Sequence, residues 1–270
     1  MARQSEHVRV WKARPGSDLA ACEDRVASEE PLEIRIAGRP LSVTMRTPGH
    51  DEELAAGFLV GEGVVRRREE IAHIRRCDLA PGSAIDVIVS PGVAVDFARL
   101  TRHVFASSSC GVCGSATIEA VRRMCPSLGA GPVVEQRVLH GLADRLREAQ
   151  PTFDVTGGLH AAGLFDALGG LVVAREDIGR HNAVDKVIGH EFLAGRLPLG
   201  DRVLMVSGRA SFEIIQKALA AGVPIVAAVS APSSLAIELA DEANLTLVGF
   251  LRPGGFNVYT HPERVAAAPR

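Results

Sequence analysis

The second half of the chain contains short apolar runs separated by segments with helical periodicity. Four runs rich in Val, Leu and Ile have the length of buried strands, namely 171–174, 203–206, 225–229 and 245–251. Apolar side chains at helical spacing fill the intervals, at residues 182–194, 211–221 and 233–243. Strands that alternate with helices predict βαβ units and a largely parallel, buried sheet.

The first third of the chain alternates apolar and polar residues with a period of two. We expect four strands in it, at residues 32–36, 41–45, 85–89 and 93–97. Turn residues separate the first two, which is typical of a β-hairpin. Asp51–Val60 places acidic residues in a first turn and apolar residues at helical spacing, so it predicts a helix that ends at Gly61 or Gly63. This part is expected to be α+β.

A turn-rich stretch, 126–132, divides the two patterns. We therefore expect an N-terminal subdomain over residues 1–132 and a C-terminal α/β subdomain over residues 133–270. The first subdomain also carries a polar loop at 107–114 and a short helix expected at 115–124. The two termini are expected to be loose.

Composition narrows the class of protein. The chain has 270 residues, of which 47% are apolar and only 4% aromatic, so it can bury a core but lacks a stacking platform for single-stranded nucleic acid. The net charge of −2 argues against general nucleic-acid binding. The first residues have no apolar signal core, and the most apolar stretch, 223–230, is too short to span a bilayer. We expect a soluble cytoplasmic protein whose five cysteines are not a disulfide framework.

Cys110 and Cys113 form a Cys-x-x-Cys pair inside the polar loop. Gly111 and Gly114 follow the two cysteines, and the expected helix begins directly after the loop. The positive end of a helix favours thiolate over thiol, and glycine lets a bulky reactant approach closely. This arrangement suits sulfur transfer, in which a thiolate attacks a donor persulfide, becomes a persulfide itself and passes the terminal sulfur on.

Three other kinds of site share this cysteine spacing. Half of a structural zinc site needs two further ligands, whereas the remaining cysteines are scattered at Cys22, Cys77 and Cys125 and are interpreted as small apolar fillers. A thioredoxin-like oxidoreductase is the second possibility. A zinc-dependent deaminase is the third, but Ser109 stands where its Pro would be and His160 comes after the cysteines with no Glu near it.

The strand ends of the second half carry polar and glycine-bearing loops. They lie at 175–182, 207–211, 230–234 and 252–255, each interpreted as leading into a helix. Ligands of open parallel sheets bind outside the carboxyl ends of the strands, and helix N-termini with Ser, Gly and Arg suit phosphate. We expect a nucleotide or pyrophosphate ligand, held by Arg180, Ser207 and Arg209 among others. Individually, Ser211 and Ser233 could be simple helix caps, and the arginines solvated surface charges.

Asp154–His160 contains two adjacent glycines and a histidine, placed after a short apolar strand in this interpretation. A lone histidine of this kind is more often a hydrogen-bonded structural residue than a catalyst. Its role stays open at this point.

Six segments in sequence resemble the FdhD family of formate dehydrogenase accessory sulfurtransferases, over roughly residues 30 to 262. The most specific is Arg175–Gly189, with the sequence REDIGRHNAVDKVIG. The others are 53–63, 108–114, 156–162, 207–213 and 248–252.

This resemblance implies a cytidine deaminase-like fold, a homodimer and a sulfurtransferase activity. Family members take sulfur from a cysteine desulfurase and transfer it to the molybdenum of bis-molybdopterin guanine dinucleotide, the cofactor of formate dehydrogenase. Cys110 matches the persulfide carrier and Cys113 its neighbour. The cofactor-associated stretch maps to Phe250, Leu251, Arg252, Pro253, Gly254 and Gly255. The cofactor is then a bound substrate, and no permanently bound metal is expected. The alternative is a cofactor-binding chaperone with a structural or zinc-bound cysteine pair.

Overall fold

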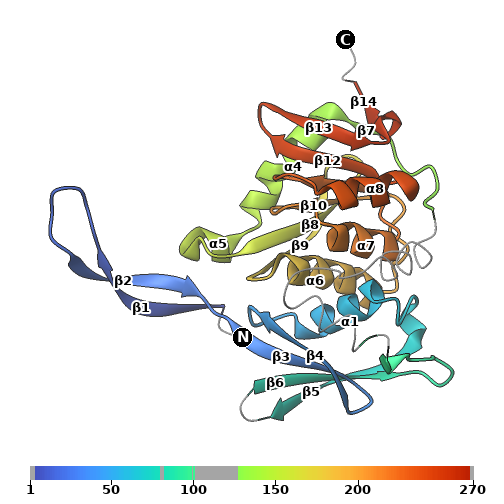
Figure 1. Cartoon of the computed structure of the whole chain (residues 1–270), viewed down its shortest axis with the longest axis horizontal. Coiled ribbons are helices and arrows are strands. Elements are labelled where there is room, and N and C mark those ends of the chain that lie inside the picture. Colours follow the sequence, from blue (N-terminus) through green and yellow to red (C-terminus); the bar gives the residue numbers. More distant parts are fainter. Residues whose placement is uncertain (1–3, 80–81, 99, 101–126, 268–270) are drawn as a thin grey trace.

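The computed structural model describes residues 4–79, 82–98, 100 and 127–267. The loop with Cys110 and Cys113, and the helix expected at 115–124, lie outside these residues. Two sheets and the helices between them make up the body of the molecule (Figure 1). The α/β class expected from the sequence is confirmed, whereas the likeness to cytidine deaminase stays a prediction.

The first sheet has four strands, in the order β4-β3-β6-β5. They are β3 (Glu30–Ile36), β4 (Arg39–Arg46), β5 (Ile71–Leu79) and β6 (Gly82–Val89). The expected hairpin at 32–36 and 41–45 is confirmed as β3 and β4, which pair antiparallel. Helix α1 (Asp51–Gly61) follows them and ends at Gly61, one of the two expected positions, and a 3-10 turn covers Arg68–Glu70.

The strand expected at 93–97 is wrong. This segment is irregular up to Asp96, and a helical turn begins at Phe97. A strand at 93–97 would pair with β6, but β5 pairs with β6 there instead. The sequence pattern did not predict β5. Arg39 instead stacks over the ring of Phe97, with 3.8 Å from its Cζ atom to the ring centroid.

The second sheet has six strands, in the order β13-β12-β11-β10-β8-β9. They are β8 (His160–Asp166), β9 (Leu171–Asp177), β10 (Arg202–Val206), β11 (Ile225–Ala228), β12 (Thr246–Arg252) and β13 (Gly255–Thr260). Strands β10, β11 and β12 are parallel, but β8 runs antiparallel to both β10 and β9, and β13 runs antiparallel to β12. The expected largely parallel sheet is therefore mixed, because two hairpins extend the parallel centre.

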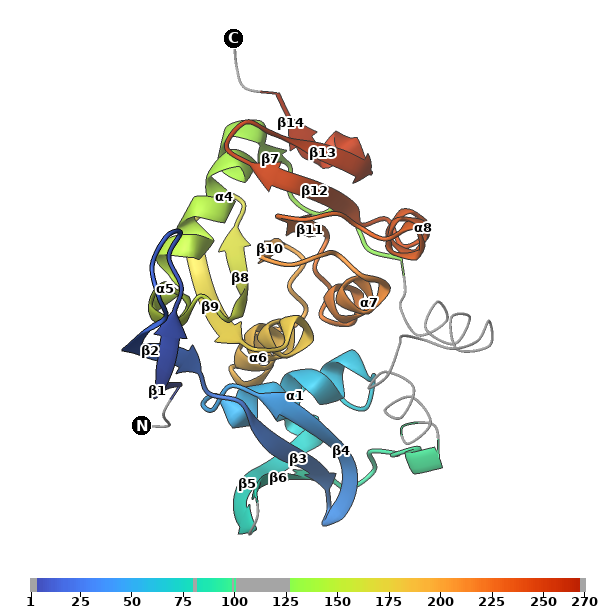
Figure 2. The same ribbon diagram turned by 60° about the vertical axis from the view of Figure 1, so that its left-hand side comes forward.

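Helices cover both faces of this sheet. On one face lie α6 (Arg180–Leu193), α7 (Phe212–Ala220) and α8 (Ser234–Glu242), close to the three expected ranges (Figure 2). On the other face lies α4 (Gln136–Glu148), which buries Leu139, Leu142 and Leu146 against the sheet. A short helix, α5 (Pro151–Thr156), stands where the sequence placed a strand before Asp154. A two-stranded pairing of β7 (Val134–Glu135) with β14 (Val265–Ala266), the latter after a 3-10 turn at Pro262–Arg264, completes this part.

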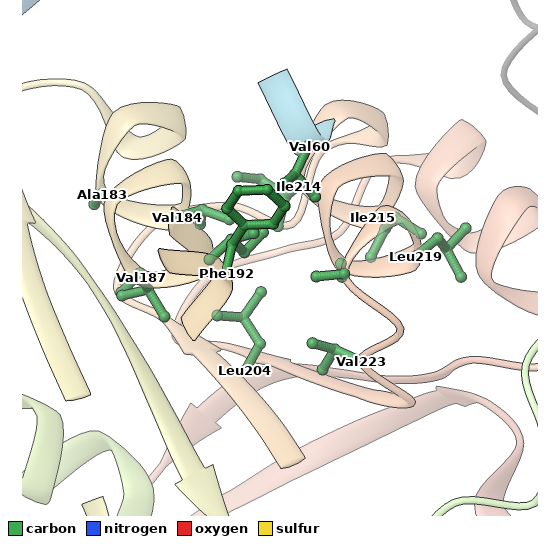
Figure 3. Close-up of a cluster of buried hydrophobic side chains, with 14 of the residues drawn as sticks. Val60, Ala183, Val184, Val187, Phe192, Leu204, Ile214, Ile215, Leu219 and Val223 are labelled. Atoms are coloured by element: carbon green, nitrogen blue, oxygen red, sulfur yellow. The ribbon is translucent and has the colours of Figure 1, made fainter. Parts of the chain in front are cut away.

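Both sheets share one apolar core, because α1 packs directly on α6. Figure 3 shows the part where Val60 of α1 meets Phe192 and Ile214 of α6 and α7, above Leu204 of β10. The two helices approach most closely at two glycines. A Cβ atom at Gly57 would lie 1.9 Å from the carbonyl oxygen of Asp185, and one at Gly189 would lie 1.8 Å from that of Glu53. Only glycine fits at these positions.

The extreme ends of the chain, which the sequence predicts to be loose, lie outside the described residues. Residues 5–27 form a hairpin of β1 (Ser5–Lys12) and β2 (Ala20–Ala27), named the arm below. The arm projects away from the body (Figure 1). Among the described residues, no helix is both long and apolar enough to cross a membrane.

Candidate functional site at the carboxyl edge of the second sheet

Four strands of the second sheet end at the same edge, since β9, β10, β11 and β12 all run in one direction. Hydrogen bonds join the loops that follow them. The N–H of Ser233 donates to the carbonyl of Ala210 at 3.0 Å, and the N–H of Phe250 donates to that of Ser230 at 3.2 Å. The loops thus form one continuous polar edge, the place where ligands bind in open α/β sheets.

Three of the four loops lead into helices, and the fourth does not. Helices α6, α7 and α8 begin directly after β9, β10 and β11. Residues 252–255, in contrast, turn between β12 and β13, so the expected helix start there is wrong. The edge therefore has three helix N-termini that favour an anion and one glycine-bearing hairpin beside them.

Arg180 is the cation placed deepest at this edge. It is the first residue of α6, and its Nε atom is buried without a hydrogen-bond partner among the described residues. A Cβ atom at Gly208 would lie 3.5 Å from Arg180 Cδ and 3.5 Å from His160 Nδ1. Gly208 therefore lies directly beside both side chains. A buried guanidinium donor without a protein acceptor suits a bound anion.

His160 stands beside this guanidinium, at the start of β8. Burial, together with the positive charges of Arg180 and His181, lowers the pKa of His160, and Asp177 opposes them only in part. The neutral imidazole is therefore favoured, which can both donate and accept a hydrogen bond.

The His181 side chain contacts residues at the start of α7, in the loop that follows β10. Its Nε2 atom lies 2.8 Å from Glu213 Oε2 and 3.3 Å from Ser211 Oγ. The hydrogen bond from His181 lowers the pKa of Glu213. Both partners use the same ring nitrogen, so the carboxylate does not orient the far side of the ring as in a Ser-His-acid triad. This geometry does not support a hydrolase.

Some of the remaining expected site residues have side chains engaged within the fold, and others are exposed to solvent. Ser207 Oγ accepts the N–H of Ala161 at 2.9 Å, so its hydroxyl supports the β8–β10 junction. Arg209 is exposed and available. Ser233 is a helix cap, as its Oγ accepts the N–H of Ala236 at 3.3 Å, whereas Ser211 begins α7 without a side-chain cap bond.

Phe250 is an exposed aromatic residue in a strained backbone conformation. Its φ angle is +53°, a region that residues other than glycine rarely adopt, and its side chain is 38% exposed. Arg252 is exposed and lies with its Cζ atom 5.9 Å from the Phe250 ring centroid. Leu251 is fully buried in the core under α4, so only its backbone could reach a ligand. Pro253 and Gly254 are exposed in the turn, and Gly255 is partly exposed.

Most charged residues of the segment 175–189 serve the fold. Arg175 donates two hydrogen bonds to Glu53, at 2.6 and 2.7 Å. Asp177 pairs with Lys186 at 2.6 Å, with both side chains fully buried. The interpretation of this segment as an anion-binding loop therefore applies to Arg180 and His181, while its other charges hold α6 against the N-terminal part.

A second buried pair joins α6 to α7. Lys217 Nζ lies 2.7 Å from Asp185 Oδ1. Burial disfavours the charged amine, but the Asp185 carboxylate outweighs it and raises the pKa of Lys217. The sequence analysis did not predict the pairing of Lys217 with Asp185. Charged residues on otherwise apolar helix faces were the signal that could have indicated a buried ion pair.

A mixed α/β sheet whose carboxyl edge carries arginines and helix N-termini suits an anionic ligand at that edge. Residues 27–266 match the FdhD/NarQ family, so the chain belongs to this family, as the resemblance predicted. It is 51% identical to the sulfur carrier protein FdhD of Streptomyces avermitilis, over 98% of this chain and 97% of that one. It is 52% identical to the sulfur carrier protein FdhD of Mycobacterium tuberculosis, over 90% and 92% of the two chains.

The structure is also similar to a crystal structure from Desulfotalea psychrophila, described as that of a formate dehydrogenase accessory protein. The TM-score is 0.78 at 28% sequence identity, and the match covers 98% of this chain and 100% of that one. The fold described above is thus found in a solved structure.

Proposed function

We propose that this protein is a sulfur carrier that delivers sulfur to a molybdenum cofactor for a formate dehydrogenase. Two relatives at about half identity are named sulfur carrier proteins, and the similar solved structure is described as a formate dehydrogenase accessory protein. The observation that carries the cofactor half of the proposal is the buried Nε atom of Arg180 at the carboxyl edge, which has no hydrogen-bond partner in the described part of the chain.

Cys110 carries the sulfur in this proposal. Its thiolate attacks the terminal sulfur of a persulfide on a cysteine desulfurase. A sulfur–sulfur bond forms on Cys110 as the donor's sulfur–sulfur bond breaks, and the donor leaves as a thiolate. No net oxidation occurs, because one persulfide replaces another. The protein acts as a cytoplasmic sulfurtransferase.

Cys113 releases the sulfur. Its thiolate attacks the inner sulfur of the Cys110 persulfide, which gives a Cys110–Cys113 disulfide and expels hydrosulfide. The two thiol sulfurs are oxidised and the carried sulfur is reduced by the same two electrons. The hydrosulfide is then available as a ligand for molybdenum, and a cellular dithiol restores the cysteine pair.

The cofactor, bis-molybdopterin guanine dinucleotide, is the acceptor substrate and binds at the carboxyl edge. Arg180 and Arg209 face its phosphates, with N–H groups at the starts of α6 and α7. Phe250 and Arg252 offer an exposed aromatic ring and a guanidinium against which a planar base can stack. Two strand spacings, about 10 Å, separate the ends of β10 and β12, which suits a ligand with a base at one end and phosphates at the other.

Intact-mass spectrometry tests the sulfur-carrying step. After incubation with a cysteine desulfurase and cysteine, the wild-type chain should gain the mass of one sulfur, removable by a thiol reductant. Cys110→Ala should not gain it, whereas Cys113→Ala should gain it and deliver it poorly to the client enzyme. Full activation of formate dehydrogenase by Cys110→Ala contradicts the proposal. Zinc bound in a one-to-one ratio, and lost only with the fold, would favour a chaperone with a structural cysteine pair.

A further inference from the structure

His160 begins strand β8, yet it lies at the carboxyl edge, because β8 runs antiparallel to its neighbour β10. Two hydrogen bonds fix the backbone beside it. The N–H of Ser207 donates to the carbonyl of Ala161 at 2.9 Å, and the N–H of Ala161 donates to Ser207 Oγ at 2.9 Å. The ring of His160 itself has no hydrogen-bond partner among the described residues. It is a positioned polar group whose two ring nitrogens stay available to a ligand.

The His160 ring and the Arg180 side chain meet beside Gly208. A Cβ atom at Gly208 would lie 3.5 Å from His160 Nδ1 and 3.5 Å from Arg180 Cδ. The Nε atom bonded to this Cδ is the buried donor that lacks an acceptor in the described part of the chain. An anion that accepts from this donor above Gly208 therefore comes within reach of the imidazole. The first turn of α6 begins at the same place, and no side-chain cap occupies its N–H groups.

The imidazole is neutral before a ligand arrives. Burial lowers the pKa of His160, and the positive charges of Arg180 and His181 on α6 lower it further. Asp177 on β9 opposes these effects only in part. The loop after β10 faces the ring with Gly208, which carries no charge. A neutral imidazole offers one donor and one acceptor, so one of its nitrogens meets an anion unfavourably.

A bound phosphate reverses this balance of charges. Its negative charge offsets the guanidinium of Arg180 and favours the imidazolium over the imidazole. The imidazolium donates from both nitrogens, and a hydrogen bond between two charged groups is shorter and stronger than a neutral one. The phosphate and the proton therefore stabilise each other at this site.

We propose that the His160 ring is a ligand of the cofactor's diphosphate and takes up a proton from solvent when this anion binds. The proton adds to the unprotonated ring nitrogen, and no other bond changes. This inference rests on the proposed cofactor site and adds a proton to its binding equilibrium. Affinity therefore falls as pH rises, because the complex then loses the proton that the bound diphosphate favours. Deprotonation of His160 would thus assist release of the finished cofactor.

Proton uptake by the full-length protein tests the proposal directly. Diguanosine diphosphate is the probe, because its diphosphate is a diester like that of the cofactor and keeps its charge from about pH 5.5 to 8, where histidine titrates. Calorimetric titrations in two buffers of different ionisation enthalpy give the number of protons bound with each ligand. The wild type should take up part of a proton, and its affinity should fall as pH rises through this range.

His160→Gln separates the proton from the hydrogen bond. The amide keeps a neutral donor at this position but does not titrate, so proton uptake should disappear. Its affinity should match that of the wild type within a few-fold at about pH 8 and be roughly tenfold weaker at about pH 6. His73→Gln is the matched control, because His73 is exposed on β5 of the first sheet. It should keep both the affinity and the proton uptake of the wild type.

The outcomes distinguish this inference from the proposed function on which it rests. Binding of the probe without proton uptake overturns the role of His160 and leaves the cofactor site standing. Uptake that persists in His160→Gln assigns the proton to another group and overturns it as well. A wild-type protein that does not bind the probe contradicts the cofactor site itself, and the inference with it.

A methyl group at Gly208 tests the place of the phosphate. Its contacts of 3.5 Å are ordinary ones, and the backbone of Gly208 is not in the left-handed region, so Gly208→Ala should keep the Tm of the wild type. The methyl group lies between His160 and Arg180, so binding of the probe should weaken about tenfold or more at every pH. Gly200→Ala, where a Cβ meets no atom within 4 Å, is the control and should bind normally. Wild-type affinity in Gly208→Ala overturns the proposed placement.

Discussion

Lys186 Nζ lies 2.6 Å from Asp177 Oδ2, and neither side chain is exposed to solvent. The amine also donates to the carbonyl of Thr47 at 2.9 Å, while the other Asp177 oxygen accepts the N–H of Gly179 at 2.9 Å. This one ion pair therefore joins β9, the start of α6 and the segment after β4. It orients the N-terminus of α6, where Arg180 lies.

Removing one partner of this pair should be strongly destabilising. Lys186→Met leaves the Asp177 carboxylate buried and unpaired, which we expect to lower the free energy of unfolding by about 3–5 kcal/mol. Urea unfolding measures it. Arg137→Ala is the control, because its guanidinium is 72% exposed beside Glu135 and should change stability by less than about 0.5 kcal/mol. Equal stability of the two variants would show that the buried pair is not required.

The crossing of α1 and α6 should not tolerate a methyl group. Gly57→Ala and Gly189→Ala each place a Cβ within 2 Å of a backbone oxygen, so the helices must separate. We expect a loss of about 1–3 kcal/mol or more for each. Gly200→Ala is the control, since a Cβ there meets no atom within 4 Å. Thermal unfolding compares the three. An unchanged Tm for Gly189→Ala would mean that the helices cross less closely than described.

The free energy of unfolding should fall at acidic pH, because protonation of Glu53 removes its stabilising interactions. Burial alone would raise the pKa of Glu53, but hydrogen bonds from Arg175, His50 and His190 outweigh it and hold this pKa far below its usual value. A carboxyl with a depressed pKa stabilises the fold above its unfolded pKa of about 4.3, and this contribution is lost as pH falls below that value. Glu53→Gln should therefore be less stable than wild type at pH 7, and the difference should shrink toward pH 2. Urea midpoints across this range measure it, and a constant difference would contradict the assignment.

Anion binding should depend on Arg180 more than on distant arginines. GDP serves as a fragment of the cofactor in a calorimetric titration. Loss of a charge-assisted contact costs about 1.5–3 kcal/mol, so Arg180→Ala should weaken GDP binding roughly ten- to a hundredfold. Arg252→Ala should weaken it as well if the base stacks at Phe250. Arg137→Ala, on α4 at the opposite face of the sheet, should bind like wild type. Equal affinity for ATP and GDP would count against a guanine-specific site.

Sequence periodicity located the central helices and strands well, since their apolar faces are long and regular. Helices α6, α7 and α8 begin within two residues of the expected positions. It failed for 93–97, where alternation is present but the neighbouring strand β6 is already paired on both sides, with β3 and β5. It also failed for the arm, whose alternation includes many charged residues and is not stabilised by a core within this chain.

Local sequence also placed the strand-end loops at one edge, because parallel strands necessarily end together. It could not separate ligand-facing charges from structural ones within the segment 175–189. Arg175 and Lys186 are chemically as suited to phosphate as Arg180. Their partners, Glu53 and Asp177, assign them to the fold, and Glu53 is far from Arg175 in the sequence.

The sequence by itself therefore determined the α/β class, the order of the central elements, the family and the cysteine pair that suits sulfur transfer. Only the tertiary structure decided which charges are buried in pairs, that Arg180 at the carboxyl edge keeps a donor without a partner among the described residues, and that the first residues form an arm with Trp11 near its tip. The physical reason is that periodicity and motifs are local properties of a chain, whereas desolvation and pairing of a charge depend on residues that folding brings together from distant positions.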